Sequence, residues 1–382
     1  MTYTESFKPA FDLIYLVSCA VNGEKPDKKI CEKMELTEVL NTAVSHSLCV
    51  AAALSLEQIM TLPADFKEAK YKAVRRLSLM NVERERIFKA FEDKKISYAP
   101  LKGIVIKDCY PKTSMREMGD NDILCNKDRA EEIKDVMEGL GFACKSFGKT
   151  NHDVYIKPPQ LSFEIHRSLF DRANDPGYYE YFADVWDGLK KDEKKHFCYH
   201  MTNEDHYIFL LCHLFKHYKR KGTGLRSLLD VYVFFRKYGS CMDKKYLNSE
   251  LQKLELVDFE STIRELAFKT ITGQPLSKEE NAELCFFIGS NTHGTKENYL
   301  TRQLQNDDSV TAKRRYAVSR LFPSKESLKK EHPFVYTHMG IYPLWILYRP
   351  IKGAVKYPKK MFGEIKRLKN FKKKENTGKF NK

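Results

Sequence analysis

The spacing of the apolar residues changes at Ile96, and this change does most to limit the folds that the chain can adopt. Residues 65–93 repeat apolar side chains every three or four positions, which is typical of a helix that buries one face. Residues 36–59 are rich in Ala, Leu and Val, contain no Gly or Pro, and are closed by Pro63. The chain before Ile96 is therefore predicted to be helical.

Short segments with alternating apolar and polar residues follow Ile96, and Gly and Pro residues separate them. Such alternation is typical of half-buried strands, whose side chains point to opposite faces in turn. Strands are predicted at 96–101, 120–125, 142–147, 152–157 and 160–166, and helices at 104–110 and 127–140. These segments predict a small unit that mixes strands and helices.

Helical patterns return after this unit, most clearly at 204–217 and 225–238. We therefore predict an α+β fold in which a minimal mixed β-sheet core is flanked by N- and C-terminal helical regions. The predicted parts are a helical N-terminal region at 1–95, the core at 96–172, a helical C-terminal region at 173–332, and an aromatic segment with a basic tail at 333–382.

The positive charge of the chain is concentrated in this tail. Residues 351–382 hold twelve Lys or Arg and two acids, so their balance is +10 out of a total of +15. The overall charge therefore does not by itself predict nucleic-acid binding. The tail after Tyr357, including Lys372, Lys373 and Lys374, lacks apolar periodicity and is predicted to be disordered and separable. Docking of residues 333–350 and the tail on an anionic membrane, or weak contact with RNA, stays open beside a core helix with a solvated tail.

The ten cysteines are scattered and form neither a C-x-x-C motif nor a zinc-finger spacing. Free thiols of this kind are typical of a reducing compartment. The N-terminal residues show no signal-peptide pattern, and no apolar run approaches the ~20 residues that span a bilayer. These observations predict a cytoplasmic protein.

The segment with the most chemical information is residues 116–124, which contains Asp120 and Asp122. Two positions apart on a strand, their side chains face the same way, about 6.5–7 Å apart along the chain. Two carboxylates that converge on one point repel each other unless a cation lies between them. Mg²⁺, or Mn²⁺ in its place, prefers such oxygen ligands and keeps positions open for phosphate. The pair therefore predicts a metal site.

Glu164 is the candidate third carboxylate. It alternates with Phe163 and Ile165 in the last predicted strand, so it lies on the polar face of that strand together with His166. Three acids suit two metal ions, which clamp the attacking and leaving oxygens of a phosphoryl transfer. Glu164 is expected to bind metal and to help deprotonate the acceptor hydroxyl.

Lys102, Gly103 and Arg116 are the candidate nucleotide-binding residues. Lys102 and Gly103 lie where the first predicted strand gives way to a helix, and the backbone N–H groups at such a junction attract anions. Glycine lets a phosphate approach the backbone closely. Lys102 adds a mobile positive charge, and the planar guanidinium of Arg116 matches phosphate oxygens.

The order of these motifs resembles the uncharacterised nucleotidyltransferase family of the polymerase-β-like nucleotidyltransferase superfamily. The matching pieces are Leu101-Lys102-Gly103, Tyr110-Pro111, Arg116-x-x-Gly119-Asp120-x-Asp122, residues 139–142, Glu164-x-His166 and, more weakly, Leu225-Arg226-x-x-x-Asp230. The resemblance runs from the N-terminal helices to about residue 235, and an extension to Arg349 is left open. It implies a Mg²⁺-bound NTP, such as ATP, and transfer of its nucleoside monophosphate to an acceptor hydroxyl with release of pyrophosphate. The acceptor is left open among a sugar, a small molecule, a protein and RNA.

One residue departs from the superfamily pattern. That pattern usually places Gly-Ser after the first strand, whereas Ile104 follows Gly103 here. The phosphates must then be held differently, with Lys102 as the compensating group. The alternative function is a non-catalytic nucleotidyltransferase-like protein that binds a nucleotide or a partner.

Each candidate residue also has a structural interpretation. The Asp pair would then be a solvated strand edge, Glu164 would pair with Arg167, and Arg116 would pair with an acid. His166 would orient a neighbour or pack in the core, and Asp230 would pack between helices rather than line the cleft. His213 and His217 lie one helical turn apart, but Leu214 stands where a zinc protease would need Glu.

Overall fold

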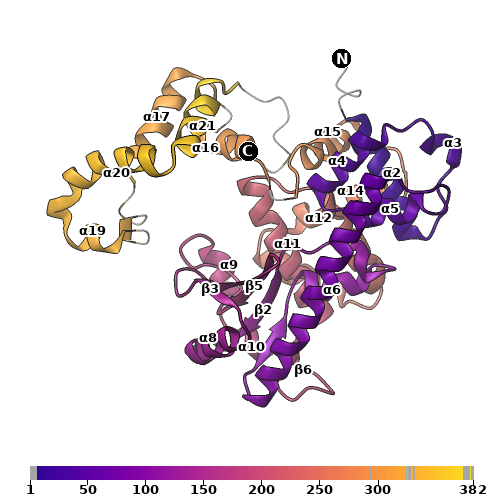
Figure 1. The fold of residues 1–382 in the computed structure, drawn as a ribbon, viewed down its shortest axis with the longest axis horizontal. Helices are drawn as coiled ribbons and strands as arrows, with labels where there is room; N and C mark the ends of the chain where they lie inside the picture. The colour runs from indigo at the N-terminus through magenta and orange to yellow at the C-terminus, as the bar shows by residue number, and fades with distance from the viewer. Residues whose placement is uncertain are drawn as a thin grey trace. The chain divides into compact units, whose positions relative to one another are not determined.

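The computed structural model describes residues 7–292, 294–305, 307–323, 325, 328–329, 332–372 and 379. The described chain divides into two units. The first consists of residues up to 217 together with 223–292, and the second of residues 218–222 together with those after 293. The α+β fold class is confirmed, because helices precede and follow a five-stranded mixed sheet (Figure 1). The four-part division predicted above is finer than these two units and stays a prediction.

The predicted N-terminal helices are present, with one break. Residues 36–59 form two helices rather than one, because Ser47 adopts a left-handed backbone conformation with φ of 55°. The break follows the buried His46, the last residue of the first of these helices, whose Nδ1 accepts a hydrogen bond from the Leu225 backbone N–H over 3.2 Å. The helices are α2 (Lys8–Asn22), α3 (Lys28–Cys31), α4 (Leu36–His46), α5 (Cys49–Leu56) and α6 (Ala64–Asp93).

All five predicted strands form one sheet in the order β1-β2-β5-β4-β3. β2 and β5 run parallel, and the other neighbouring pairs run antiparallel. The strands are β1 (Tyr98–Pro100), β2 (Asn121–Cys125), β3 (Ala143–Ser146), β4 (His152–Lys157) and β5 (Leu161–His166). Between them lie α7 (Gly103–Ile106), η1 (Lys107–Cys109), η2 (Thr113–Met115), η3 (Lys127–Arg129) and α8 (Ala130–Gly139).

Apolar side chains cover one face of this sheet. Ile123, Phe163 and Ile165 pack with residues of α6 and α8 in one buried cluster. Strand side chains alternate between faces, so their polar neighbours emerge on the other side. The alternation of the sequence thus fixes which face of the sheet carries chemistry.

The rest of the first unit is mostly helical. Its long helix α12 was predicted with the observed bounds, and α14 packs beside it through Tyr232 and Phe268. The elements are α9 (Pro176–Tyr181), α10 (Val185–Gly188), β6 (Lys190–Lys191), β7 (Tyr199–His200), α11 (Asn203–Arg220), α12 (Leu225–Tyr238), α13 (Lys244–Lys253), α14 (Val257–Ile271) and α15 (Lys278–Ile288).

The second unit corrects the prediction of a disordered tail. Residues 358–369 form a helix, and Phe371 is buried against Leu300, Leu304 and Tyr316. Lys373 and Lys374 lie outside the described residues. The sequence analysis missed this packing because the apolar partners of Phe371 lie more than fifty residues before it in the chain. The elements are α16 (Lys296–Gln303), α17 (Val310–Leu321), α19 (Pro333–Thr337), η4 (Met339–Ile341), α20 (Tyr342–Lys356) and α21 (Pro358–Lys369).

Deletion of the residues after Tyr357 is expected to destabilise the second unit. The deletion exposes the apolar cluster around Tyr316 and removes Glu364, which accepts hydrogen bonds from Tyr316 and Arg320 at 2.7 and 2.9 Å. Limited proteolysis should therefore cut α17 faster in the truncated protein than in the full chain. Equal cutting rates would show that the tail is separable after all.

None of the helices in the described part of the chain combines the length and apolar character needed to cross a membrane. All ten cysteines are free thiols.

Candidate active site

Asp122 and Glu164 occupy matched positions on adjacent strands. β2 and β5 are parallel, and their register places Asp122 opposite Glu164. Both carboxylates therefore emerge side by side on the face of the sheet away from the core. Two of the three predicted acids thus share one site.

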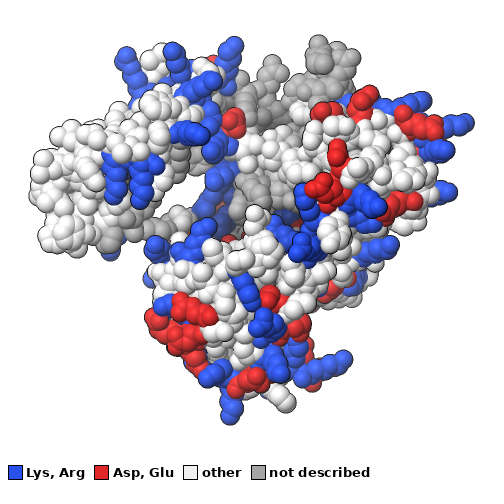
Figure 2. Space-filling model, viewed as in Figure 1, with Lys and Arg blue, Asp and Glu red and all other residues white. Residues whose placement is uncertain are grey.

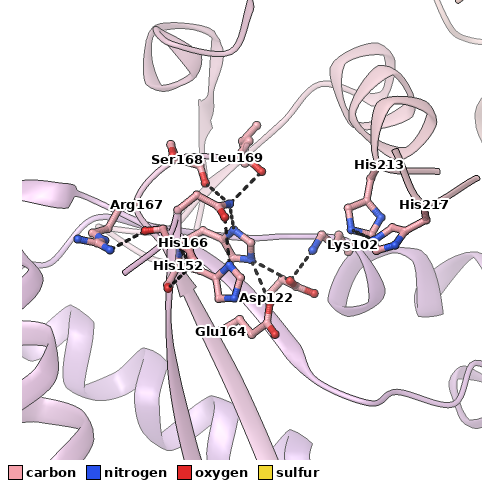
Figure 3. A network of polar contacts seen from close by, with 12 residues as sticks. Lys102, Asp122, His152, Glu164, His166, Arg167, Ser168, Leu169, His213 and His217 are labelled. Carbon is pink, nitrogen blue, oxygen red and sulfur yellow. Dashed lines mark hydrogen bonds and ion pairs between the residues drawn. The ribbon is translucent and has the colours of Figure 1, made fainter. Parts of the chain in front are cut away.

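The Asp122 carboxylate lies between two nitrogen groups. Lys102 Nζ donates to its Oδ1 over 2.6 Å, and His166 Nε2 lies 2.9 Å from the same oxygen (Figure 3). Burial by itself would raise the pKa of Asp122, but Lys102 and His166 outweigh burial and hold that pKa well below its ordinary value. Asp122 is therefore an anion at any pH near neutral.

Glu164 faces a different environment. His152 Nε2 and His166 Nε2 lie 3.5 and 3.7 Å from its Oε2. Burial raises the pKa of Glu164 to about 7, and the negative charge of Asp122 acts in the same direction. Burial also lowers the pKa of His152 to about 4, so this imidazole is neutral near pH 7 and offers a lone pair. Glu164 can therefore take up or release a proton in the neutral range.

We expect the stability contributed at Glu164 to fall as the pH rises. Folding raises its pKa from an ordinary 4.5 to about 7. The folded chain holds an extra proton between these values, so stability that is present below pH 4.5 is lost as the pH passes 7. Glu164→Gln keeps the shape but not the charge, and it should raise the Tm above about pH 8 while changing it little near pH 4.5. Thermal melts at both pH values check this, and an equal Tm change at both would contradict it.

Side chains that suit a divalent cation gather around Glu164. One nitrogen each of His152 and His166 and one oxygen of Glu164 all lie within 4.8 Å of one another. Ligands at about 2.0–2.2 Å from one ion lie roughly 3.0–3.6 Å from each other. The spacings of 3.5 and 3.7 Å to Glu164 are close to that range. This imidazole and carboxylate set suits Mn²⁺ or another transition metal, and it shares Glu164 with the predicted acids.

Asp120 lies one residue before β2 rather than inside it. Burial raises its pKa and the charge of Asp122 adds to the shift, whereas Lys102 opposes it. The two aspartates therefore influence each other electrostatically. Metal binding by Asp120 stays a prediction.

Lys102 occupies the turn between β1 and α7 in a strained conformation. Its φ of 45° and ψ of −119° lie in a region that glycine adopts more readily than residues with a side chain. Its amine nevertheless reaches Asp122, and strain of this kind is concentrated at functional sites. The turn therefore holds the amine in place at an energetic cost.

Comparison of Lys102→Gly with Lys102→Ala is expected to reveal that strain. Both variants lose the amine, but only glycine relaxes the backbone. Lys102→Gly should therefore be more stable than Lys102→Ala by about 1 kcal/mol. Urea unfolding curves measure the difference, and identical midpoints would show that the turn is unstrained.

Arg116 lies in a buried network next to the site. Its Nε and Nη2 donate to Oδ1 and Oδ2 of Asp230 at 3.1 and 2.8 Å, and the Tyr110 hydroxyl donates to Oδ1 at 2.7 Å. A Cβ atom on Gly103 would lie 2.5 Å from Arg116 Nη1, so Gly103 leaves the room that this guanidinium needs. Both residues thus have a packing role, and their contact with phosphate stays a prediction.

Residues 32–271, more than half of the chain, match the model of a protein family described as uncharacterised nucleotidyltransferase. The chain belongs to this family. The resemblance predicted from the motifs is therefore confirmed. No curated protein and no solved structure matches the chain.

The nucleotidyltransferase family match covers the sheet and every candidate site residue named above, from Lys102 to Asp230. It ends at the last residue of α14, so α16 to α21 lie outside it. Family membership therefore bears on the site of the first unit and leaves the second unit unexplained.

Three histidines near the site had no predicted role in it. His152 lies opposite His166 because Lys157 pairs with Leu161 across the Pro158-Pro159 turn. That turn is visible in the sequence, and counting back from it identifies the pair. His213 and His217 of α11 lie beside Lys102 with their Nε2 atoms 3.1 Å apart. Burial lowers the pKa of His213 well below its ordinary value, and Lys102 adds to the shift. No local sequence signal brings α11 to this sheet face.

Proposed function

We propose that the protein transfers a nucleoside monophosphate from an NTP to an acceptor hydroxyl and releases pyrophosphate. One observation carries the proposal: Asp122 and Glu164 lie in register on parallel strands, with Lys102 and two histidines around them. Membership of the nucleotidyltransferase family supports the reaction class. The reaction is an in-line attack on the α-phosphorus.

The donor chemistry of the site fits Mg²⁺ or Mn²⁺. Asp120, Asp122 and Glu164 supply carboxylate oxygens, and His152 supplies a neutral imidazole nitrogen near pH 7, while His166 Nε2 is engaged in the hydrogen bond to Asp122. When bound, such a cation offsets the negative charge of the triphosphate and polarises its oxygens.

Lys102 and Glu164 have separate tasks in the proposed reaction. The Lys102 amine rests on Asp122 at 2.6 Å, and it exchanges to a phosphate oxygen when an NTP brings further negative charge to the site. His166 keeps Asp122 oriented during that exchange. Glu164 accepts the proton of the acceptor hydroxyl, because its carboxylate lies in register with Asp122 on the face of the sheet where the proposed reaction takes place.

The side chain of Ile104 packs in the core, so it cannot contribute to phosphate binding in the way that the serine of the superfamily pattern does. Ile104 is buried in the same apolar cluster as Ile123 and Met118, so no side chain at this position reaches a phosphate. Lys102 takes over the anion-binding task in our proposal. The acceptor belongs to one of four classes: a sugar, a small molecule, a protein or RNA. The ten free thiols support a cytoplasmic location.

The test is to follow α-labelled NTPs. The purified protein is incubated with each of the four α-labelled NTPs, with Mg²⁺ or Mn²⁺, and with a cell extract as the acceptor source. We expect stable label on an acceptor and release of pyrophosphate, both lost in Glu164→Gln. The matched control is Asp135→Asn, which changes an exposed acid of α8.

Binding is measured separately by calorimetry with each NTP and cation. NTP binding without transfer in any extract would replace the proposed enzyme with the non-catalytic nucleotide-binding alternative. An NTP affinity that does not depend on the cation would contradict the proposed metal site, since bare carboxylates repel a triphosphate.

A further inference from the structure

Helix α20 of the second unit exposes an apolar stripe. Its members recur at the three- and four-residue spacing that places side chains on one face of a helix, within an arc of about 100°. Each is between 56 and 79% exposed: Leu344, Leu347, Tyr348, Ile351 and Val355. Large apolar side chains aligned in this way and left in solvent indicate an interaction surface.

The other side of α20 already has a partner within the unit. A groove of about 720 Å³ is lined by residues of α17, α20 and α21, and Trp345, Arg349 and Gly353 are its contributions from the far side of α20. The Arg349 guanidinium lies 5.2 Å from the centre of the Trp345 ring. Tyr348 of the stripe also lines this groove, whereas the four aliphatic members of the stripe lie outside it.

The charge around the stripe is strongly positive. Residues 342–372 contain nine Lys or Arg and one acid, Glu364, so the net charge is 9 − 1 = +8. Glu364 is already bound to Arg320 and Tyr316. Lys352 lies next to the stripe, with its amine 5.7 Å from the centre of the Tyr348 ring. Figure 2 shows largely uncharged surface around α19 and α20, interrupted by a group of Lys and Arg side chains, and further Lys and Arg side chains over α17 and α21.

We propose that the second unit docks on an anionic lipid bilayer through the apolar stripe of α20. A helix that carries Leu, Ile and Val on one face and cations beside it lies in the plane of a membrane, with the apolar face in the acyl boundary and the cations on lipid phosphates. The described helices are too short or too polar to cross the bilayer, so the contact is peripheral.

Lipid fits this surface better than RNA does. Proteins bind single-stranded RNA with cations and aromatic platforms on which bases stack. Four of the five stripe residues are aliphatic, and aliphatic side chains gain most from hydrocarbon. The proposal concerns the second unit alone and is independent of the function proposed for the first.

The test is sedimentation of the full-length protein with vesicles of phosphatidylcholine, with and without phosphatidylserine. We expect binding to the anionic vesicles that is at least about tenfold weaker in Leu344→Gln/Leu347→Gln/Ile351→Gln. The matched control is Val44→Gln/Tyr71→Gln/Val82→Gln, which changes three exposed apolar residues of α4 and α6 and should bind like the wild type. Lys352→Glu/Lys356→Glu should lose the preference for phosphatidylserine.

Fluorescence gives a second measurement that does not depend on the glutamine variants. The two native tryptophans are removed by Trp186→Phe and Trp345→Phe, and Leu347→Trp then places a single tryptophan within the stripe. Its emission should shift to shorter wavelength when anionic vesicles are added. An unshifted emission, unchanged sedimentation of the stripe variant, or binding to single-stranded RNA but not to vesicles would each overturn the proposal.

Discussion

Asp122→Asn is expected to lower nucleotidyl transfer by at least about 1000-fold. The substitution removes the negative charge that holds Lys102 and that supports the proposed cation, while it keeps the shape of the side chain. Initial rates of label transfer from a saturating α-labelled NTP measure the loss. Asp135→Asn, on the exposed surface of α8, should keep the wild-type rate.

Glu164→Gln separates lost chemistry from lost folding in this experiment. Asp122→Asn leaves the largely buried Lys102 without its anion, so a drop in rate could reflect unfolding. Glu164→Gln should stabilise the protein at alkaline pH and still lose transfer by about 100-fold or more. Full transfer by Glu164→Gln would disprove its role as the proton acceptor.

Asp230→Ala is expected to cost about 3–5 kcal/mol of unfolding free energy, because it leaves the Arg116 guanidinium buried without its anion. Arg116 and Asp230 are both buried, and Tyr110 donates to the same carboxylate. Denaturant unfolding measures the loss. Asp258→Ala, which removes an exposed acid of α14, should change the free energy by less than about 0.5 kcal/mol.

A double-mutant cycle distinguishes an ion pair from general packing. Arg116→Met/Asp230→Leu replaces both charges with apolar side chains, so it should cost much less than the sum of the single changes. If the two losses simply add, the pair does not interact and the network around Arg116 is held by other contacts.

The strands and most helices were predictable because their signals are local. Alternation predicted the polar face of β2 and β5, and the three- and four-residue spacing of apolar residues predicted α6. The break at Ser47 was not predictable, since a serine with positive φ has no distinctive sequence signal. The packing of α21 was also missed, because its partners in α16 and α17 are distant in the chain.

In the candidate site, too, the features with local sequence signals were predictable and the contacts between distant elements were not. Asp122 and Glu164 could be paired from strand alternation and the order of the motifs. The sequence could not show that Lys102 rests on Asp122, that Asp230 engages Arg116, or that His213 approaches from α11, because each depends on how separate elements pack. Electrostatic interactions between residues distant in the chain depend on the fold, so they cannot be predicted from a sequence motif alone.

The segment Tyr218–Gly222 has a practical consequence for anyone who shortens this protein. It is grouped with the second unit although it comprises the last residues of α11 and part of the turn that leads to α12. The Lys221 carbonyl accepts a hydrogen bond from Thr295, and the Tyr218 carbonyl accepts one from Arg302. A chain that ends at residue 292 lacks Thr295 and Arg302, so this segment loses both of these hydrogen-bond partners. To express the first unit alone, the chain must therefore be ended after residue 292 and residues 218–222 must be redesigned as well.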